Sequence, residues 1–290
     1  MTSPRRQRRE TAEAPRGIGG LPPFPSHGPI AALRVLGRGF EISLDSNRTE
    51  LRLGRDGPPL ADVQLPLPSI SRVHALLTRR SDALEVTDLG SKNGIAYPSP
   101  FLSHAQQAYV RCERLLVHVG DRFALGNVPL LALDEQTHQL VQPITAYCGA
   151  GAHDDVDGAL ESILRSHMII LHGSRSDVVL ELARTLHAHS IRKGFPFTPI
   201  NAVPESEAAI EELCTQAGCG TIFLDLTRPF ELPLVFARNL FLDHFHLWTI
   251  VVTPVAVDAI RCFGEAWYEP KRQGFSICEL RSPGWVGTGL

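Results

Sequence analysis

Short apolar or alternating runs fill the chain between about residues 30 and 134. Gly, Pro, Asp and Asn separate these runs, which is typical of strands joined by tight turns. The runs are Ala32–Leu36, Phe40–Leu44, Glu50–Leu53, Val73–Thr78, Leu84–Thr87, Leu115–Val119, Arg122–Leu125 and Val128–Leu133. Their length and spacing predict an all-β antiparallel sandwich, which we assign to residues 29–137.

After residue 157 the apolar residues follow helical spacing instead. The predicted helices are a first one carrying Val156, Leu160, Ile163 and Leu164 on one face, then Val178–Ser190 and Glu205–Ala217. The predicted strands between them are Met168–Leu171, Thr221–Leu224 and Trp248–Val252. Strands that alternate with helices predict an α/β domain with a parallel sheet over residues 157–290.

Two segments follow neither pattern. Residues 1–28 are rich in Pro, Gly and Arg, which predicts a disordered basic tail. Such a tail either touches nucleic acid or acidic lipid or is simply solvated, and the second interpretation is the simpler one. Residues 138–156 have weak patterning and contain Gly149 and Gly151, so we assign them to a linker.

Composition narrows the class of protein. The 290 residues are 43% hydrophobic and 20% charged, which is enough for two cores. A net charge of −3 argues against a protein that mainly coats nucleic acid. No apolar run approaches the roughly 18 residues of a membrane span, and no apolar segment of a secretory signal follows the basic N-terminus. The six cysteines form no C-x-x-C pair, which favours reduced thiols. We expect a cytoplasmic protein without membrane contact.

The polar residues of the first half concentrate in three turns. Gly54-Arg55 follows one predicted strand, Ser71-Arg72-Val73-His74 opens another, and Lys92-Asn93-Gly94 closes a third. These turns resemble the forkhead-associated (FHA) domain, whose signature is G-R, then S-x-x-H, then N-G, in this order. Val119–Gly126 also resembles the late G-D-x-x-x-x-G of that family, and Ile95 replaces the usual threonine. The resemblance covers about a hundred residues.

The chemistry of these turns suits a phosphate ester. A phosphothreonine carries roughly −1.5 to −2 charges and three acceptor oxygens. Arg55 can present its guanidinium fork to two of those oxygens, Ser71 can donate its hydroxyl, and Lys92 can add a point charge. The alternative is that Arg55, Ser71 and Asn93 are ordinary turn residues of a sandwich, which the joint occurrence of the motifs makes improbable.

The FHA resemblance also implies individual roles. Arg55 and Ser71 would hold the phosphate, and Lys92 lies where a phosphate-contacting side chain is often found. Asn93 would hold the peptide backbone, and Arg72 would face the peptide. The residues with a supporting role would be Gly54, His74 and Gly94.

Four segments of the second half resemble the AAA+ (P-loop) ATPase domain of bacterial enhancer-binding proteins, the activators of sigma-54 RNA polymerase. They are Leu171–Gly173, Ala183–Ser190, Phe197–Asn201 and Gly220–Asp225. Family members carry similar strings in this order. The resemblance spans roughly residues 157–285 and implies a core derived from a nucleotide-binding fold.

The groups that bind and hydrolyse ATP are missing from this second resemblance. A P-loop needs glycines and a lysine for the phosphates and a Ser or Thr for Mg²⁺. The loop after Gly173 has no further glycine, and Val179 stands where the lysine would be. Asp225 keeps the Walker B position, but Leu226 replaces the glutamate that polarises water. The resemblance thus implies a degenerate, non-hydrolysing domain without a bound cofactor.

Other family features are also missing. Pro254 lies near the position of the sensor asparagine, and residues 263–265 lack the arginine of the finger-like segment. The stretch between Asn201 and Gly220 has no room for the loop that touches the sigma factor. His244 and His246 lie two positions apart, but no Cys or third His lies at the spacing of a zinc site, so we predict no metal site.

We therefore expect a signalling adaptor and not an enzyme. The FHA domain would dock onto a phosphothreonine protein of a Ser/Thr kinase pathway, and the α/β domain would pack in a homo-oligomer or against an AAA+ partner. The main alternative is a sigma-54-type transcriptional regulator with an ATP-binding AAA+ domain. A third hypothesis is that the FHA domain binds a phosphorylated Thr2 or Thr11 of its own chain.

Overall fold

The computed structural model describes residues 28–98, 109–149, 151–165, 168–173, 176–190, 192–200, 206–218, 220–226, 248–253 and 277–282. The chain forms two compact units. Unit 1 includes His27–Leu36 and Phe40–Glu135, and unit 2 includes Gln136–Leu290. Each unit is described by itself.

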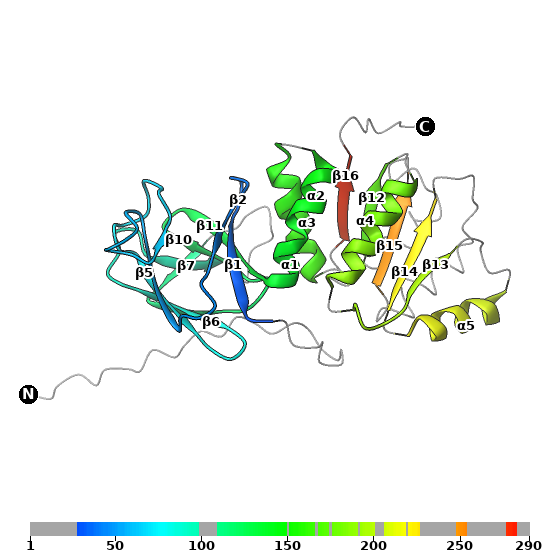
Figure 1. Ribbon diagram of the computed structural model, residues 1–290, viewed down its shortest axis with the longest axis horizontal. Helices are drawn as coiled ribbons and strands as arrows, with labels where there is room; N and C mark the ends of the chain where they lie inside the picture. The colour runs from blue at the N-terminus through cyan, green and yellow to red at the C-terminus, as the bar shows by residue number, and fades with distance from the viewer. Residues whose placement is uncertain are drawn as a thin grey trace, which may run out of the picture. The chain divides into compact units, whose positions relative to one another are not determined.

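Unit 1 consists of two β-sheets (Figure 1). The six-stranded sheet has the order β2-β1-β11-β10-β7-β8, with β1 Ile30–Val35, β2 Phe40–Ser43, β7 Ile95–Pro98, β8 Tyr109–Cys112, β10 Arg122–Leu125 and β11 Val128–Asp134. The five-stranded sheet has the order β4-β3-β5-β6-β9, with β3 Glu50–Gly54, β4 Val63–Gln64, β5 Ala75–Arg79, β6 Leu84–Asp88 and β9 Arg114–Val117. Paired strands are antiparallel except β3 and β4, which pair in parallel.

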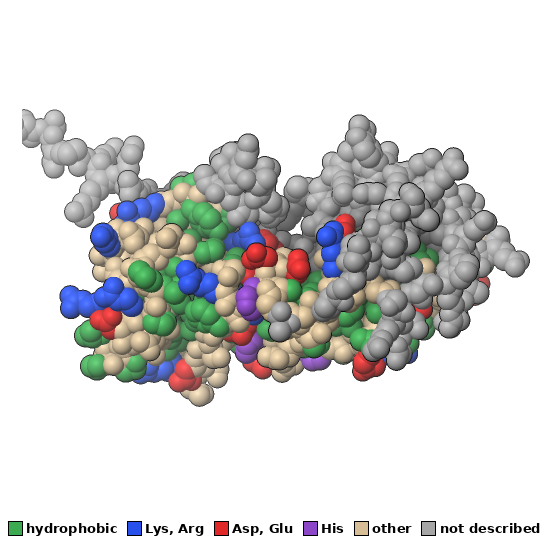
Figure 2. Space-filling view, turned by 90° about the horizontal axis from the view of Figure 1, so that it is seen from above, with side chains coloured by type: hydrophobic (Ala, Val, Ile, Leu, Met, Phe, Trp, Pro, Cys, Tyr) green, Lys and Arg blue, Asp and Glu red, His purple; other side chains and the backbone are tan. Residues whose placement is uncertain are grey.

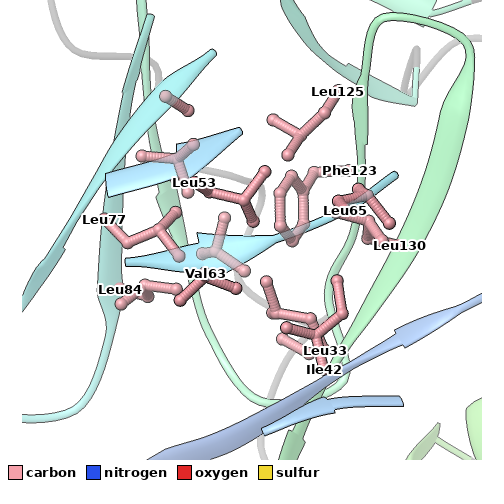
Figure 3. Close-up of a cluster of buried hydrophobic side chains, with 14 of the residues drawn as sticks. Leu33, Ile42, Leu53, Val63, Leu65, Leu77, Leu84, Phe123, Leu125 and Leu130 are labelled. Atoms are coloured by element: carbon pink, nitrogen blue, oxygen red, sulfur yellow. The ribbon is translucent and has the colours of Figure 1, made fainter. Parts of the chain in front are cut away.

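Alternating side chains decide which face of each strand is buried. In β3, Leu51 and Leu53 are buried, whereas Glu50 and Arg52 are exposed. Because the side-chain period of a strand is two, a shift of one residue would turn both leucines to solvent. Figure 3 shows side chains from both sheets pointing toward one another in a single core, among them Leu33, Ile42, Leu53, Val63, Leu65, Leu77, Leu84, Phe123, Leu125 and Leu130.

A guanidinium connects the edges of unit 1. Arg79 lies at the end of β5 and donates hydrogen bonds to the carbonyl oxygens of Ile30, Leu44, Asp45 and Arg48 at 2.6–3.2 Å. These carbonyls belong to the start of β1 and to the loop between β2 and β3. One side chain thus fixes the beginning of the first strand against the five-stranded sheet.

The predicted sandwich is confirmed. All eight predicted strands are present, with ends that differ by one or two residues. Three strands were not predicted, namely β4, β7 and β8. β4 has only two residues, and β7 follows directly on the Asn93-Gly94 turn. The parallel pair of β3 and β4 also departs from the purely antiparallel expectation.

Unit 2 contains a five-stranded sheet in which every pair is parallel, as predicted. The strand order is β13-β14-β15-β12-β16, with β12 Met168–His172, β13 Phe197–Ile200, β14 Thr221–Asp225, β15 Trp248–Thr253 and β16 Ile277–Arg281. The helices are α1 Glu135–Gln139, α2 Val141–Cys148, α3 His153–Arg165, α4 Ser176–Ala188 and α5 Glu207–Ala217. α3 packs against β16, and α4 packs against β14 and β15 (Figure 1). The sequence did not predict β13 and β16 as strands.

Residues 138–156 differ from the predicted linker, because most of them are helical. α2 buries Val141, Ile144, Tyr147 and Cys148 on one face, and α3 begins at His153. Gly149 ends α2 with φ +93°, and its N–H donates to the Thr145 carbonyl. The glycine that indicated a linker is therefore a helix C-cap, where a left-handed residue is favoured.

Three cysteines of the described residues are free thiols, and two of them belong to the core of unit 2. Burial raises the pKa of Cys148 and of Cys214 to about 11, so both thiols stay neutral. Several predictions lie outside the described residues: the tail of residues 1–27 with Thr2 and Thr11, the zinc alternative at His244 and His246, and the segments around Pro254 and residues 263–265. Within the described ranges, no helix is both long and apolar enough to cross a membrane.

Candidate functional site

Three loops meet at one end of the five-stranded sheet. β3 ends at Gly54, β5 begins at Ala75 opposite Leu53, and β6 ends at Asp88 opposite Ala75. The loops that follow β3, precede β5 and follow β6 therefore leave the sheet at the same edge. These loops carry the predicted site residues Arg55, Ser71, Arg72, Lys92 and Asn93.

The imidazole of His74 joins two of the loops. It is fully buried, and its Nδ1 accepts a hydrogen bond from the Ser71 N–H at 3.1 Å. Its Nε2 lies 3.0 Å from the Gly94 carbonyl oxygen and donates to it. Since one ring nitrogen accepts and the other donates, the neutral Nε2–H tautomer satisfies both contacts. His74 thus connects the loop of Ser71 to the Asn93-Gly94 turn, and its predicted supporting role stays a prediction.

Gly54 permits the closest backbone approach of the site. A Cβ at this position would lie 2.0 Å from the carbonyl oxygen of Arg72, so no larger residue fits without movement. The Arg55 N–H next to it donates to the Ser71 carbonyl at 3.0 Å. The backbone of Arg55 and the loop of Ser71 and Arg72 are therefore in direct contact.

The hydroxyl of Ser71 is oriented by the third loop. Its Oγ accepts a hydrogen bond from the Lys92 N–H at 3.0 Å, which leaves the hydroxyl proton available for donation. The Asn93 side chain donates through Nδ2 to the Ser69 carbonyl at 2.8 Å, so its Oδ1 can still accept. Ser71 is half-buried, and Lys92 and Asn93 are exposed.

Hydrogen bonds to the Gly94 backbone hold the Asn93-Gly94 turn in place. Gly94 has φ +78°, a conformation that glycine adopts without strain. Its N–H donates to Ser91 Oγ at 2.8 Å, and its carbonyl also accepts from the Gly126 N–H at 2.8 Å. The Ser91 N–H in turn donates to Asp88 Oδ1 at 3.0 Å. The backbone of Gly94 is therefore held by Ser91, His74 and Gly126.

The charged groups at this edge are mostly cationic. The Arg55 side chain is 43% exposed, and its Nε lies 3.1 Å from Asp56 Oδ1. Arg72 and Lys92 are exposed on the two neighbouring loops. A guanidinium, an ammonium and an oriented hydroxyl form a donor-rich surface, which suits a multiply charged anion such as a phosphate ester.

Sequence reasoning missed two partners of these residues. Asp56 pairs with Arg55 and follows it directly, so the adjacent opposite charges were a usable signal. Ser69 holds Asn93 through its backbone carbonyl across 24 positions, and its side-chain type gives no signal of this contact.

The predicted degenerate nucleotide positions lie at the carboxyl edge of the sheet of unit 2. Gly173 follows β12, and Asp225 and Leu226 end β14 and begin the next loop. β15 separates β12 from β14, so Gly173 and Asp225 belong to strands that are not neighbours. The Leu226 N–H donates to the Val252 carbonyl at 2.8 Å.

Buried side chains surround Gly173. Val179 is 1% exposed on α4, and its Cγ2 would lie 3.4 Å from a Cβ at Gly173. The Tyr147 hydroxyl would lie 3.0 Å from the same point and donates to the His172 carbonyl at 2.8 Å. Burial raises the pKa of Tyr147, so the phenol stays a neutral donor. Apolar and aromatic groups therefore pack around Val179, the position at which the AAA+ resemblance would require a phosphate-binding lysine.

Residues 51–126 match the model of the FHA domain family. No curated protein matches the chain. The crystal structure of the FHA domain of CT664 from Chlamydia trachomatis is 30% identical, over 37% of this chain and 98% of that one, with a TM-score of 0.26.

Two further structures are similar at lower identity. Mycobacterium tuberculosis EmbR, in complex with a low affinity phosphopeptide, is 21% identical over 36% of this chain and 24% of that one, with a TM-score of 0.29. The FhaA FHA domain, complexed with the intracellular domain of Rv3910, is 22% identical over 35% and 97%, with a TM-score of 0.27. The family model and the three loops carry the assignment: residues 51–126 form an FHA domain.

Proposed function

We propose that this FHA domain binds phosphothreonine-containing segments of partner proteins and that the chain is a cytoplasmic signalling adaptor. The observation that supports it is the contact among the three loops that carry Arg55, Ser71 and Lys92. Recognition of phosphorylated motifs by clustered basic side chains is a recurring binding mode, and FHA domains use it.

The proposed roles follow from the donors. Arg55 gives up its exposed pair with Asp56 and offers its guanidinium to the phosphate. Ser71 donates its hydroxyl proton to the phosphate, because its Oγ only accepts in the contact with the Lys92 N–H. Lys92 and Arg72 add charge at the rim, and Asn93 Oδ1 accepts a peptide N–H. Each charge-assisted hydrogen bond contributes roughly 1.5–3 kcal/mol, so a few of them anchor a short peptide.

The test is Arg55→Ala measured by fluorescence anisotropy against phosphothreonine peptides chosen from an array. We expect a loss of at least about tenfold in affinity, since one charge-assisted bond or more disappears. Arg80→Ala is the matched control. Arg80 is 52% exposed, pairs with Glu85 at 2.8 Å, and lies beyond the opposite end of β5. Wild-type affinity in Arg55→Ala, with circular dichroism unchanged, would place the phosphate elsewhere.

For unit 2 we propose a protein-packing role without ATP hydrolysis, in a homo-oligomer or against an AAA+ partner. The support is the buried Val179 at the position that the resemblance assigns to the lysine, and Leu226 at the position of the glutamate. The rival, a sigma-54-type regulator with an ATP-binding domain, requires ATP turnover. A phosphate-release assay with Mg²⁺ and ATP separates the two, and sustained turnover by the purified chain would favour the rival.

The target of the FHA domain can also lie in the same chain, at Thr2 or Thr11. Mass spectrometry after treatment with a Ser/Thr kinase tests this variant of the proposal. If neither threonine is modified, the result counts against binding within the same chain.

A further inference from the structure

Arg111 lies against the Asn93-Gly94 turn, although it is distant in sequence from all three motifs. It belongs to β8, where it pairs with Ala96 of β7, so Gly94 is its diagonal neighbour two residues earlier. A Cβ at Gly94 would meet the Arg111 guanidinium, with Nε at 2.1 Å, Cζ at 2.7 Å and Nη2 at 2.8 Å. The guanidinium therefore packs directly over the Cα of Gly94, and the absence of a side chain there makes room for it.

Several other arginines of unit 1 have a carboxylate partner. Five such pairs are Arg34–Glu41, Arg48–Asp62, Arg55–Asp56, Arg80–Glu85 and Arg114–Glu85. Arg111 is exposed, and no ion pair or hydrogen bond joins its side chain to any described residue. The same holds for the side chains of Arg72 and Lys92. Among the described residues, the cations without a partner thus include three at or beside the loops that carry Arg55, Ser71 and Lys92. Figure 2 shows several Lys and Arg side chains on the surface of unit 1.

We propose that Arg111 is a specificity residue that binds an acidic side chain of the phosphorylated partner, beside the phosphothreonine. This inference rests on the proposed function, because the loops must first hold the phosphate. A planar guanidinium that lies over Gly94, and whose donors have no partner among the described residues, matches a carboxylate in two parallel hydrogen bonds. The preferred ligand is therefore an acidic segment that contains phosphothreonine.

The reach of a peptide is compatible with this arrangement. Arg111 covers Gly94, and adjacent Cα atoms are about 3.8 Å apart, so the guanidinium lies in the immediate surroundings of Asn93. An extended peptide advances roughly 3.3 Å per residue. An Asp or Glu within about two to four positions of the phosphothreonine can reach the guanidinium while the phosphate stays near Arg55 and Ser71.

The test uses two pools of synthetic peptides with a central phosphothreonine and randomised flanks. One pool contains Glu among its flanking residues, and the other contains Gln in place of each Glu. Binding of both pools, and of the unphosphorylated Glu pool, is measured for the wild type, Arg111→Gln and Arg114→Gln. Arg114 is the control, since it is 57% exposed on β9 and pairs with Glu85.

We expect the wild type and Arg114→Gln to prefer the Glu pool by about fivefold, the upper range for an exposed ion pair. Arg111→Gln should lose that preference and bind the Gln pool as the wild type does. If the wild type binds neither phosphorylated pool better than the unphosphorylated one, the proposed function fails. If it binds both phosphorylated pools equally, or Arg111→Gln keeps the preference, only this inference fails. An equal loss for both pools in Arg111→Gln would assign Arg111 a structural role and also overturn it.

Discussion

Arg55 has a counterion in the residue that follows it, Asp56. Its Nε contacts Asp56 Oδ1 at 3.1 Å, and both side chains are more than a third exposed. A phosphate has to displace this carboxylate or share the guanidinium with it. Exposed pairs of this kind contribute roughly 0.2–1 kcal/mol, so the competition is real but small.

The first prediction follows from that competition. Asp56→Asn should tighten phosphothreonine peptide binding by up to about fivefold, because the guanidinium is released and a negative charge is removed. Isothermal titration at low salt measures the effect, and added salt should reduce it. Asp82→Asn, on the exposed turn between β5 and β6, removes the same charge far along the strand and serves as control. Equal changes in both variants would mean that only net charge matters.

His187 gives a second prediction for single residues. Burial between α4 and the sheet lowers the pKa of His187 below its ordinary value of about 6.5, and its Nδ1 lies 2.9 Å from Thr221 Oγ1. The unfolded chain therefore binds a proton more readily than the folded one. The free energy of unfolding is highest above about pH 6.5 and falls as the pH drops toward the folded pKa.

Urea unfolding of the wild type and His187→Gln at about pH 7.5 and pH 5.5 measures this contribution. We expect the wild type to lose more stability between the two conditions, since glutamine does not titrate. The difference between the two proteins removes the effect of all other titrating groups. An identical loss in both would show that His187 does not contribute to the acid sensitivity.

Among the elements, the backbone contact between β3 and the loop before β5 builds the site. Gly54 has no positive φ, so its requirement for glycine comes from the approach of the Arg72 carbonyl alone. Gly90, in the loop after β6, has φ +74°, and no atom lies within 4 Å of the position that a Cβ would occupy. Gly54 is therefore required because a side chain would clash, whereas Gly90 is favoured because of its backbone conformation.

We expect Gly90→Ala to cost about 1–2 kcal/mol of unfolding free energy, the usual penalty for a left-handed alanine, with peptide affinity largely kept. Gly54→Ala should cost more and abolish peptide binding, because the Arg72 carbonyl must move and the Arg55–Ser71 backbone bond is strained. Urea unfolding followed by circular dichroism and peptide titration measure both. Peptide binding by Gly54→Ala at wild-type affinity would contradict the role of this contact.

Element by element, the sequence was informative where its pattern was regular. Alternation at Leu51 and Leu53 located β3, and helical spacing at Val156 and Leu160 located α3. β4 was missed because two residues show no period, and the helix α2 was missed because Pro143 and Gly149 lie in it and next to it. Pro143 is in the first turn of α2, where a helix tolerates proline.

The site was predictable as a set of residue types but not as a set of contacts. Arg55, Ser71 and Asn93 stood out because their motifs recur in a fixed order. The support from Ser69 and the packing of Arg111 on Gly94 depend on strand pairing and backbone carbonyls. Such contacts depend on which strands become neighbours in a sheet, as β7 and β8 do, and the pattern within a single strand does not specify its partner.

At the scale of the whole molecule, the two units can be observed separately. The three tryptophans, Trp248, Trp267 and Trp285, all belong to the sequence of unit 2. Tryptophan fluorescence therefore follows the unfolding of unit 2, whereas circular dichroism follows both units.

Because the two units give separate signals, the effects of ATP and of a phosphothreonine peptide can be predicted separately. On the proposal that unit 2 is a degenerate AAA+ domain, Mg²⁺ and ATP should leave the fluorescence-detected unfolding temperature unchanged, because Val179 and Leu226 would replace the groups that bind and activate the nucleotide. A phosphothreonine peptide should raise only the transition of unit 1. A bound ligand at 100 times its Kd stabilises by about 2.7 kcal/mol, which is readily detected. A Mg²⁺-dependent rise with ATP would contradict the proposed role of unit 2.

The hydrogen bonds of His74 to Ser71 and Gly94 join two of the three loops through groups of the protein itself. On the proposed function, a partner would meet loops that are already connected, and charge attraction to Arg55, Arg72 and Lys92 would speed its capture. Differences between competing partners then arise in how long each stays bound. If the proposed function holds, the occupancy of the site would follow the current level of phosphorylation of its partners, because a dephosphorylated partner loses the group that the loops bind.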